Sequence, residues 1–396
     1  MNRERPGRAR RTRERASRGA SLVGREYDVE VGPVAHGGHC VARHEGRVIF
    51  VRHALPGERV RVRVTEGEEG SPYLRADAVE VTEPSAHRVV PPCPVAVPFG
   101  CGGCDFQHAT LPHQRELKAA VVREQLQRLA GIERDVVVEP VAGDLPDQDA
   151  GLRWRTRMQY EATPDGRRGL RRHRSHDVVP VEDCLIAHPD AREPDGRDRT
   201  VTEVVAAAGT ERSFEVAADG FWQVHPGAPR VLVETVIDLL APEPGEALLD
   251  LYAGVGLFAG FLAPLVAPGR VDTVEGDRRA TAYAARNLEG TGAQVHTDRV
   301  DRWLARRRDE PDAQVDLVVL DPPRTGAKRG VVVPVAALRP RAIAYVACDP
   351  AALARDVGLF AAEGYELADL RAFDLFPMTH HVECVALLTK TGSDLR

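Results

Sequence analysis

A chain of 396 residues is long enough for two or three domains, and its 43% hydrophobic content is ordinary for a globular protein. Its longest apolar runs are interrupted by proline or charge and its N-terminus lacks the apolar core of a signal peptide, so we expect a cytoplasmic protein without membrane spans. The net charge of −6, from 53 basic and 59 acidic residues, argues against a uniformly basic coat for nucleic acid.

Arginine is concentrated in two stretches of the chain. The first twenty residues hold eight arginines against two glutamates, and residues 153–174 hold eight more arginines. Because the first stretch is poor in apolar residues, we predict that residues 1–22 form a disordered basic arm. Basic patches on an acidic protein suit the guidance of a polyanion such as RNA to one face, and an ordinary solvated surface is the alternative.

Residues 27–81 alternate apolar and polar side chains with period two. In the segment GERVRVRV, for example, Val60, Val62 and Val64 share one face. Short alternating segments separated by glycine and proline turns predict a small β-barrel. The segment HALPGERVRVRV resembles the TRAM domain, an OB-like RNA-binding barrel, and this resemblance implies such a domain over residues 23–85.

Four cysteines follow the predicted barrel in a pattern that suits a metal centre. The CGGC turn supplies two thiolates two residues apart, and flanking loops can supply two more. Seven cysteines in a large chain without a signal peptide are more typical of metal ligands or a nucleophile than of disulfides. The spacing alone does not separate zinc from an iron–sulfur cluster. The four candidates are Cys93, Cys101, Cys104 and Cys184.

The stretch around these cysteines predicts a central α+β domain over residues 86–225. An amphipathic helix is expected over Leu111–Ala130, with Leu117, Val121, Leu126 and Leu129 on its apolar face. The second arginine-rich stretch is expected to form a β-hairpin that turns at residues 164–166, and its interleaved aromatic rings suit phosphate contact and base stacking. Residues 189–198 are predicted to be a polar loop.

From residue 226 to the end, strand patterns such as ALLDLY and VDLVVLD alternate with helical patterns, and two strands close the chain. This alternation specifies a parallel sheet covered on both faces, with a final antiparallel hairpin. We therefore predict an α/β fold with a C-terminal class I (Rossmann-like) methyltransferase domain over residues 226–396.

A cofactor site is predicted at the first strand-to-helix turn of that domain. The GVG sequence lets the backbone approach a ligand closely, and Glu275 at the end of the second strand can accept both hydroxyls of a ribose. Tyr252 can pack on S-adenosylmethionine, and Asp321 can meet its amino-acid or methyl-bearing end. A dehydrogenase is the alternative, but GVGLFAG lacks the full G-x-G-x-x-G spacing and a dinucleotide has no need of Cys348.

Cys348 and Glu383 form a candidate catalytic pair. Cys348 follows a short apolar strand and precedes Asp349-Pro350, which opens a helix, so its thiol is expected at the carboxyl edge of the sheet. A core cysteine is the alternative, since free cysteine is often buried. Addition of a thiolate to carbon 6 of uracil activates carbon 5 for methylation, and a base must then remove the carbon 5 proton. Glu383, at the start of the last strand, is the candidate base.

The ordered motifs CGGC, FWQVHP, DLYAGVGLF, DPPRTG, ACDPAALARD and FPMTHHVE, with the barrel before them, resemble the RNA 5-methyluridine methyltransferase family. The resemblance implies that Cys348 is the nucleophile and Glu383 the base, and that Arg324 contacts RNA or the flipped uridine. It implies S-adenosylmethionine ligands at Gln223, Tyr252, Glu275 and Asp321. It also implies that Cys93, Cys101, Cys104 and Cys184 hold a [4Fe-4S] cluster, with zinc as the lesser alternative.

The expected activity is methylation of carbon 5 of a specific uridine in ribosomal or transfer RNA, by a monomeric enzyme that flips the base out of its stack. The main alternative is a non-catalytic RNA-binding protein with a degenerate methyltransferase fold. An amino-group methyltransferase is disfavoured because Arg324 stands at the aromatic position of its D-P-P motif. A radical S-adenosylmethionine enzyme would require three cysteines at closer spacing.

Overall fold

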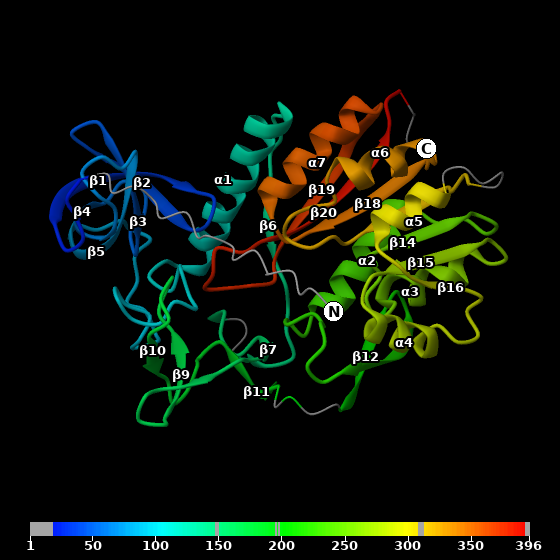
Figure 1. Ribbon diagram of the computed structural model, residues 1–396, viewed down its shortest axis with the longest axis horizontal. Coiled ribbons are helices and arrows are strands. Elements are labelled where there is room, and N and C mark those ends of the chain that lie inside the picture. Colours follow the sequence, from blue (N-terminus) through cyan, green and yellow to red (C-terminus); the bar gives the residue numbers. More distant parts are fainter. Residues whose placement is uncertain (1–18, 147–149, 195, 197–198, 308–312, 393–396) are drawn as a thin grey trace, which may run out of the picture. The chain divides into compact units, whose positions relative to one another are not determined.

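The computed structural model describes residues 19–146, 150–194, 196, 199–307 and 313–392 (Figure 1). Most of the predicted basic arm, residues 1–18, lies outside the described residues. The chain divides into two compact units, the first ending at Ser85 and the second comprising residues 34–38 and everything from Ala86 onward. In the described residues, no helix combines the length and the apolar character needed to span a bilayer.

The first unit is a closed five-stranded barrel, as predicted. Alternation of side chains makes the barrel, because Val60, Val62 and Val64 are buried while the arginines between them point outward. Two of these arginines form ion pairs, Arg61 with Asp28 and Glu80 and Arg63 with Glu26. The strands, in their order around the barrel, are β1 (Glu26–Ala35), β2 (His39–His44), β3 (Arg47–Arg52), β5 (Tyr73–Glu83) and β4 (Arg59–Glu66).

The second unit is built on a sheet that has eight strands within the described residues. Its strands are parallel except β20, which runs antiparallel to both of its neighbours, so the predicted closing hairpin is confirmed. The edge strand β6 was not predicted. The order is β16 (Gln294–Thr297), β15 (Val271–Glu275), β14 (Leu248–Leu251), β17 (Leu317–Leu320), β18 (Ala342–Ala347), β20 (Glu383–Lys390), β19 (Tyr365–Asp374) and β6 (Val138–Pro140).

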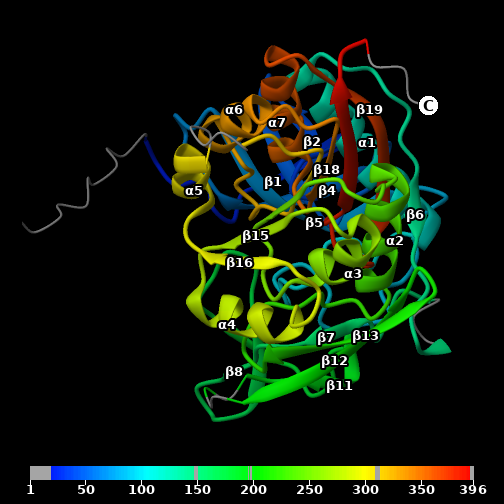
Figure 2. The ribbon, with the colours of Figure 1, turned by 90° about the vertical axis from the view of Figure 1, so that its right-hand side faces the viewer.

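Helices cover both faces of this sheet, and each face has its own apolar core (Figures 1 and 2). One core is formed with α1 (Leu111–Ala130), α5 (Val300–Arg307), α6 (Arg329–Ala337) and α7 (Pro350–Ala362). The other is formed with α2 (Ala228–Leu240), α3 (Leu257–Val266) and α4 (Arg278–Asn287). The predicted methyltransferase fold is therefore confirmed.

Short strands connect α1 to α2. The predicted hairpin forms as β8 (Glu161–Ala162) and β9 (Arg168–Arg171), and β10 (Val178–Pro180) adds a third strand. The predicted loop after residue 189 is wrong at its start, because β11 (Ala187–Arg192) pairs with β7 (Arg155–Arg157) and Arg192 forms an ion pair with Glu203. A further hairpin, β12 (Thr200–Ala207) with β13 (Thr210–Ala217), packs in the core beside α2 and α3.

Helix α1 has the predicted bounds, and Gly131 ends it in the left-handed conformation with φ of 69°. Leu117, Val121 and Leu126 are buried as expected, but Leu129 is 41% exposed. The buried face of the helix instead includes two polar side chains, Gln114 and Lys118. Burial of polar groups is unfavourable unless they are hydrogen-bonded, so their partners matter for the site described next.

Candidate active site

The second unit contains a cavity of about 1040 Å³ at the carboxyl ends of β14, β15, β17 and β18. Parallel strands bring the loops that follow them to one edge of a sheet, where open α/β folds place their ligands. All six residues predicted to bind the cofactor or to react line this cavity. They are Gln223, Tyr252, Glu275, Asp321, Cys348 and Glu383.

The turn after β14 is shaped by left-handed residues. Tyr252 has φ of 63° and Gly256 has φ of 91°, and a β-carbon on Gly256 would lie only 3.0 Å from Leu288. The Gly254 N–H donates to Glu275 Oε2 at 3.1 Å, and the Asp277 N–H donates to Glu275 Oε1 at 2.8 Å. These bonds fix the Glu275 carboxylate between the turn and the start of α4, where it lines the cavity.

Two carboxyl groups at this edge of the sheet have raised pKa values. Burial, and to a lesser extent the nearby Asp250 and Glu275, raises the pKa of Asp321 to about 7. Burial likewise raises the pKa of Asp250 to about 7, although the Ala259 N–H donates to its Oδ2 at 3.1 Å. Crowded carboxyl groups of this kind favour a ligand that brings positive charge.

The pairing of β18 with β20 brings Cys348 close to Glu383. Ala347, the last residue of β18, pairs with Cys384, and Cys348 and Glu383 are their neighbours in the chain. Burial, and to a lesser extent the Glu383 carboxylate, raises the pKa of the Cys348 thiol to about 12. Burial also raises the pKa of Glu383 well above its usual value, as does Asp321. Burial therefore favours the protonated form of both groups.

Arg324 acts against the rise in the pKa values of Cys348 and Glu383. Its guanidinium lowers the pKa of both Cys348 and Glu383, although burial dominates in each case. Arg324 Nη2 lies 3.4 Å from His381 Nε2. Burial and the neighbouring His380 lower the pKa of His381 to about 3, so that ring is neutral and can accept from the arginine.

The loop over residues 375–382, which leads into Glu383, is held by buried polar groups. Gln114 Oε1 accepts from the Met378 N–H at 2.8 Å. Lys118 Nζ donates to Asp374 Oδ1 at 2.6 Å and to the Phe376 carbonyl at 3.0 Å. Sequence analysis missed Gln114 and Lys118, and their positions among the apolar residues of α1 were the available signal.

The four cysteines proposed as ligands line a second cavity, of about 520 Å³. None of the four forms a disulfide bond with another described cysteine. The Gln107 side-chain amide donates to Cys104 Sγ at 3.1 Å, and the Gly103 N–H donates to Cys101 Sγ at 3.4 Å. Burial raises the pKa of Cys104 and of Cys184, and thiolates at neighbouring cysteines raise both further. The four sulfurs therefore share one site. They belong to Cys93, Cys101, Cys104 and Cys184.

The spacing of these sulfurs bears on the choice of metal. Tetrahedral zinc with Zn–S bonds of about 2.3 Å holds its sulfurs about 3.8 Å apart. Among the described residues, no three of the four sulfurs lie within 4.8 Å of one another. Every set of three of these sulfurs thus includes a pair farther apart than the sulfurs of a closed zinc site.

The arginine-rich stretch is less basic in the structure than in the sequence. Five of its eight arginines form ion pairs with carboxylates, so their charges are partly neutralised. Arg168, one of the five, also lies over the Tyr160 ring, with its guanidinium carbon 3.4 Å from the centroid. The five pairs are Arg153 with Asp183, Arg167 with Asp165, Arg168 with Glu193, Arg171 with Glu161, and Arg172 with Asp177.

Comparison with known proteins places these features in context. Residues 20–79 match the TRAM domain model, and residues 196–391 match the model described as tRNA (Uracil-5-)-methyltransferase. An RNA methyltransferase of Streptomyces avermitilis is 46% identical, over 94% of this chain and 100% of its own length. The 23S rRNA (uracil(1939)-C(5))-methyltransferase RlmD of Shewanella sp. (strain MR-4) is 29% identical, over 89% of this chain and 93% of its own length.

A solved structure has the same fold along most of the chain. The tRNA (uracil-54, C5)-methyltransferase of Pyrococcus abyssi, in complex with S-adenosyl-L-homocysteine, matches with a TM-score of 0.65 and 21% identity. The match covers 92% of this chain and 100% of the Pyrococcus chain.

Proposed function

Because the chain belongs to the S-adenosylmethionine-dependent RNA 5-methyluridine methyltransferase family, we propose that it methylates carbon 5 of a uridine in RNA through a covalent cysteine adduct. The observation that supports this proposal most directly is that the pairing of Ala347 with Cys384 brings the neighbouring Cys348 and Glu383 to the wall of one cavity. A nucleophile and a base facing the same substrate ring are what this chemistry requires.

S-adenosylmethionine, when bound, supplies an electrophilic methyl group. The residues that would hold it are Gln223, Tyr252, Glu275 and Asp321, and all four line the cavity. They suit this ligand because its sulfonium and ammonium groups are cations, whereas Asp321 and Glu275 are acidic, and burial together with Asp250 and Glu275 raises the pKa of Asp321. The side chain of Glu275 is fixed by backbone N–H groups, so it is oriented before the ligand arrives.

The proposed reaction begins with the thiolate of Cys348. Its sulfur bonds to carbon 6 of the uracil, and the electron pair of the carbon 5–carbon 6 double bond moves to carbon 5 and the 4-carbonyl. Carbon 5 would then take a methyl group, for which bound S-adenosylmethionine would supply the sulfonium leaving group. The Glu383 carboxylate removes the proton from carbon 5, the double bond re-forms and the thiolate departs.

Both reacting groups act in their deprotonated forms, which burial disfavours. Arg324 is the cation that lowers the pKa of both groups. We assign it the role of favouring the thiolate and the carboxylate once the uridine has displaced water. Positive charge on the methyl donor would also favour the thiolate and the carboxylate.

For the four-cysteine site we propose a [4Fe-4S] cluster. Its support is the set of four cysteines around one cavity, none of them in a disulfide among the described residues, the N–H groups that donate to two of the sulfurs, and a sulfur spacing wider than that of a closed zinc site. Gly102 and Gly103 of the same turn also line the large cavity. The cluster would therefore act by ordering that turn, and the methyl transfer needs no electron from it.

For the substrate we propose ribosomal or transfer RNA. The TRAM domain, whose resemblance implies RNA binding, and the arginine-rich stretch are the two elements that would contact it. Cys348 is only partly exposed and lines the cavity, so a uridine must leave its stack to reach the thiol, and the proposal includes base flipping.

The decisive experiment maps 5-methyluridine in ribosomal and transfer RNA from cells with and without the gene. We expect one uridine to lose its methyl group in the deletion and to regain it when the gene is restored. Complementation with a Cys348→Ala gene serves as the control for catalysis. An unchanged 5-methyluridine map in the deletion strain would contradict the proposed function.

A further inference from the structure

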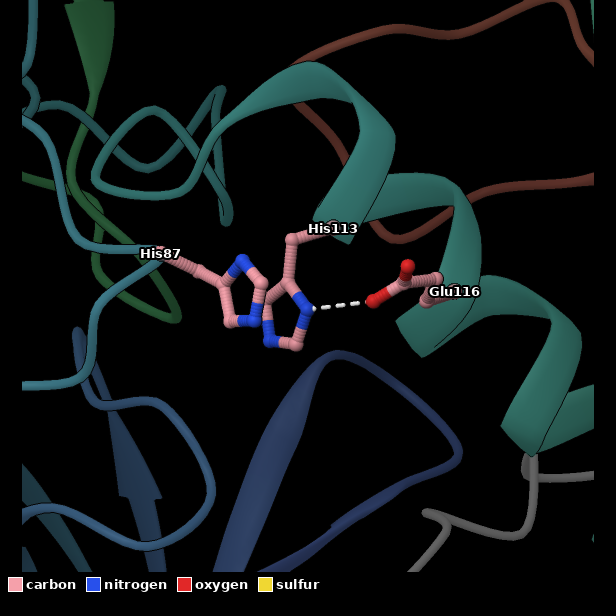
Figure 3. Close-up of side chains that lie close together, drawn as sticks. All are labelled: His87, His113 and Glu116. Carbon is pink, nitrogen blue, oxygen red and sulfur yellow. Dashed lines mark hydrogen bonds and ion pairs between the residues drawn. The ribbon is translucent and has the colours of Figure 1, made fainter.

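A third cluster of side chains lies outside both cavities. His87, His113 and Glu116 each offer one ligand atom, and these atoms all lie within 4.8 Å of one another (Figure 3). In the part of the chain that the structure describes, this is the one group of three or more His, Cys, Asp or Glu side chains with that spacing. We propose that it is a metal site for a late first-row divalent cation, and specifically for Zn²⁺.

The backbone brings the two histidines together before any ion binds. The His87 carbonyl accepts from the Thr110 N–H at 3.0 Å, and the Val89 N–H donates to the His108 carbonyl at 3.0 Å. Thr110 is the N-cap residue of α1, and His113 lies in the first turn of that helix. The segment that carries His87 is thus tied directly to the start of α1, which lowers the entropic cost of assembling a site.

Glu116 orients the ring of His113. Glu116 Oε2 lies 2.7 Å from His113 Nδ1, and in the tautomer that carries its proton on Nδ1 the ring donates this hydrogen bond. The other nitrogen, Nε2, then has a free lone pair, and it is buried without a hydrogen-bond partner among the described residues. A carboxylate that holds the far nitrogen of an imidazole is the usual partner of a metal-bound histidine. His113 Nε2 is therefore the first ligand that we assign.

His87 supplies the second ligand. Its ring stacks on His113 with the centroids 4.1 Å apart and an angle of 6° between the planes. Figure 3 shows one nitrogen of His87 beside the His113 nitrogen that does not face Glu116. A metal ion lies in the plane of each imidazole that binds it, so the side chain of His87 must rotate out of the parallel stack. This rotation disturbs little packing because His87 is exposed, and water completes the coordination.

The proposal is independent of the methyl transfer. An ion bound here would link the segment around His87 to the first turn of α1, the helix whose Gln114 and Lys118 hold the loop before Glu383. Binding to the folded state alone stabilises a protein, so the expected role is structural. The site would raise the temperature of unfolding in the presence of Zn²⁺.

The test is a calorimetric titration of the full chain, with its four-cysteine centre intact, with Zn²⁺. The variant His87→Ala removes a ligand from an exposed position, and His176→Ala removes a comparably exposed histidine outside the cluster. We expect wild type and His176→Ala to bind Zn²⁺ alike and His87→Ala to bind it at least about tenfold more weakly, because loss of even an outer partner of a metal ligand costs about that much. Glu116→Gln should fall between them.

Co²⁺ in place of Zn²⁺ distinguishes this site from the cysteines. A nitrogen and oxygen site gives Co²⁺ visible bands without the intense thiolate-to-metal charge-transfer absorption in the near ultraviolet. We expect such a spectrum in wild type and its loss in His87→Ala. Equal Zn²⁺ affinity of wild type and His87→Ala would overturn the proposal, and so would charge-transfer absorption that persists unchanged in that variant.

Discussion

Asp105 binds His380 through two hydrogen bonds, accepting from the ring at Nδ1 at 2.6 Å and from the backbone N–H at 3.1 Å. Asp105 directly follows Cys104, and His380 lies in the loop that leads to Glu383. The Asp105 and Phe106 N–H groups also donate to the Met378 carbonyl, at 2.9 and 3.0 Å. The cysteine-rich turn and the loop before the proposed base are therefore one hydrogen-bonded structure.

Asp105→Ala should loosen this connection. It removes two hydrogen bonds to a carboxylate, each worth about 1.5–3 kcal/mol, so we expect kcat to fall by about 10- to 100-fold. Binding of S-adenosylmethionine should change little, since Glu275 and Asp321 are untouched. Asp190→Ala, at an exposed aspartate, is the matched control. Single-turnover kinetics and iron content measure the outcome, and an Asp105→Ala enzyme of normal kcat would refute the positioning role.

Periodicity predicted the fold well because each element carries its own signal. The alternation of Val60, Val62 and Val64 with arginines gives the barrel, and the alternation of apolar strands with helices gives the sheet. Periodicity did not predict the strands whose formation depends on pairing with a neighbouring strand. Strand β11 and β6 form because neighbouring strands pair with them, and β6 is only three residues long.

The residues of the candidate site fall into the same two groups, those that stand in local motifs and those that depend on distant partners. Cys348, Glu383, Asp321 and Glu275 stand in local motifs, and the structure brings them to one cavity. Asp105, Gln114 and Lys118 act across the fold, on partners far away in sequence, so no local pattern points to them. What these three residues share in the sequence is a polar side chain near apolar residues. This pattern indicates a role only when the hydrogen-bond partner of the side chain is known.

Cys348→Ala should abolish methyl transfer, with a loss of at least about 10⁴-fold in kcat, because carbon 5 is not activated without the thiolate. The affinity for S-adenosylmethionine should stay near that of wild type. Transfer of a radiolabelled methyl group to RNA measures the first quantity and calorimetry the second. Cys40→Ala, at a buried cysteine of the barrel, controls for the loss of a thiol. Substantial activity in Cys348→Ala would rule out the covalent route.

Glu383→Gln should trap the reaction after methylation. The amide cannot remove the carbon 5 proton, so the sulfur–carbon 6 bond persists and a protein–RNA adduct accumulates. A denaturing gel should show a band of lower mobility that requires both RNA and S-adenosylmethionine. The double variant Cys348→Ala with Glu383→Gln should not form it. Rapid turnover by Glu383→Gln without any adduct would assign the base to another residue.

Affinity for S-adenosylmethionine should rise with pH near neutrality. Asp321 has a pKa raised to about 7 by burial and by Asp250 and Glu275, so it is neutral below that pH and ionised above it. A cationic ligand binds the ionised form, and below about pH 7 binding must expel a proton. We expect the affinity to increase about tenfold from about pH 6 to pH 8, and Asp321→Asn to flatten this dependence. Calorimetry across this range measures it, and a steep pH profile retained in Asp321→Asn would exclude Asp321 as the cause.

The four-cysteine site should contain iron. Anaerobically purified protein should be brown, with about four iron atoms and four acid-labile sulfides per chain. Cys184→Ser should lose the colour and most of the iron, because it removes one of four ligands around the cavity. The same change at Cys40, which lies in the other compact unit, should leave the iron content unchanged. Because the methyl transfer needs no electron, wild type should turn over without a reductant. Colourless protein with stoichiometric zinc that is lost in Cys184→Ser would replace the cluster with zinc, despite the wide spacing of the sulfurs.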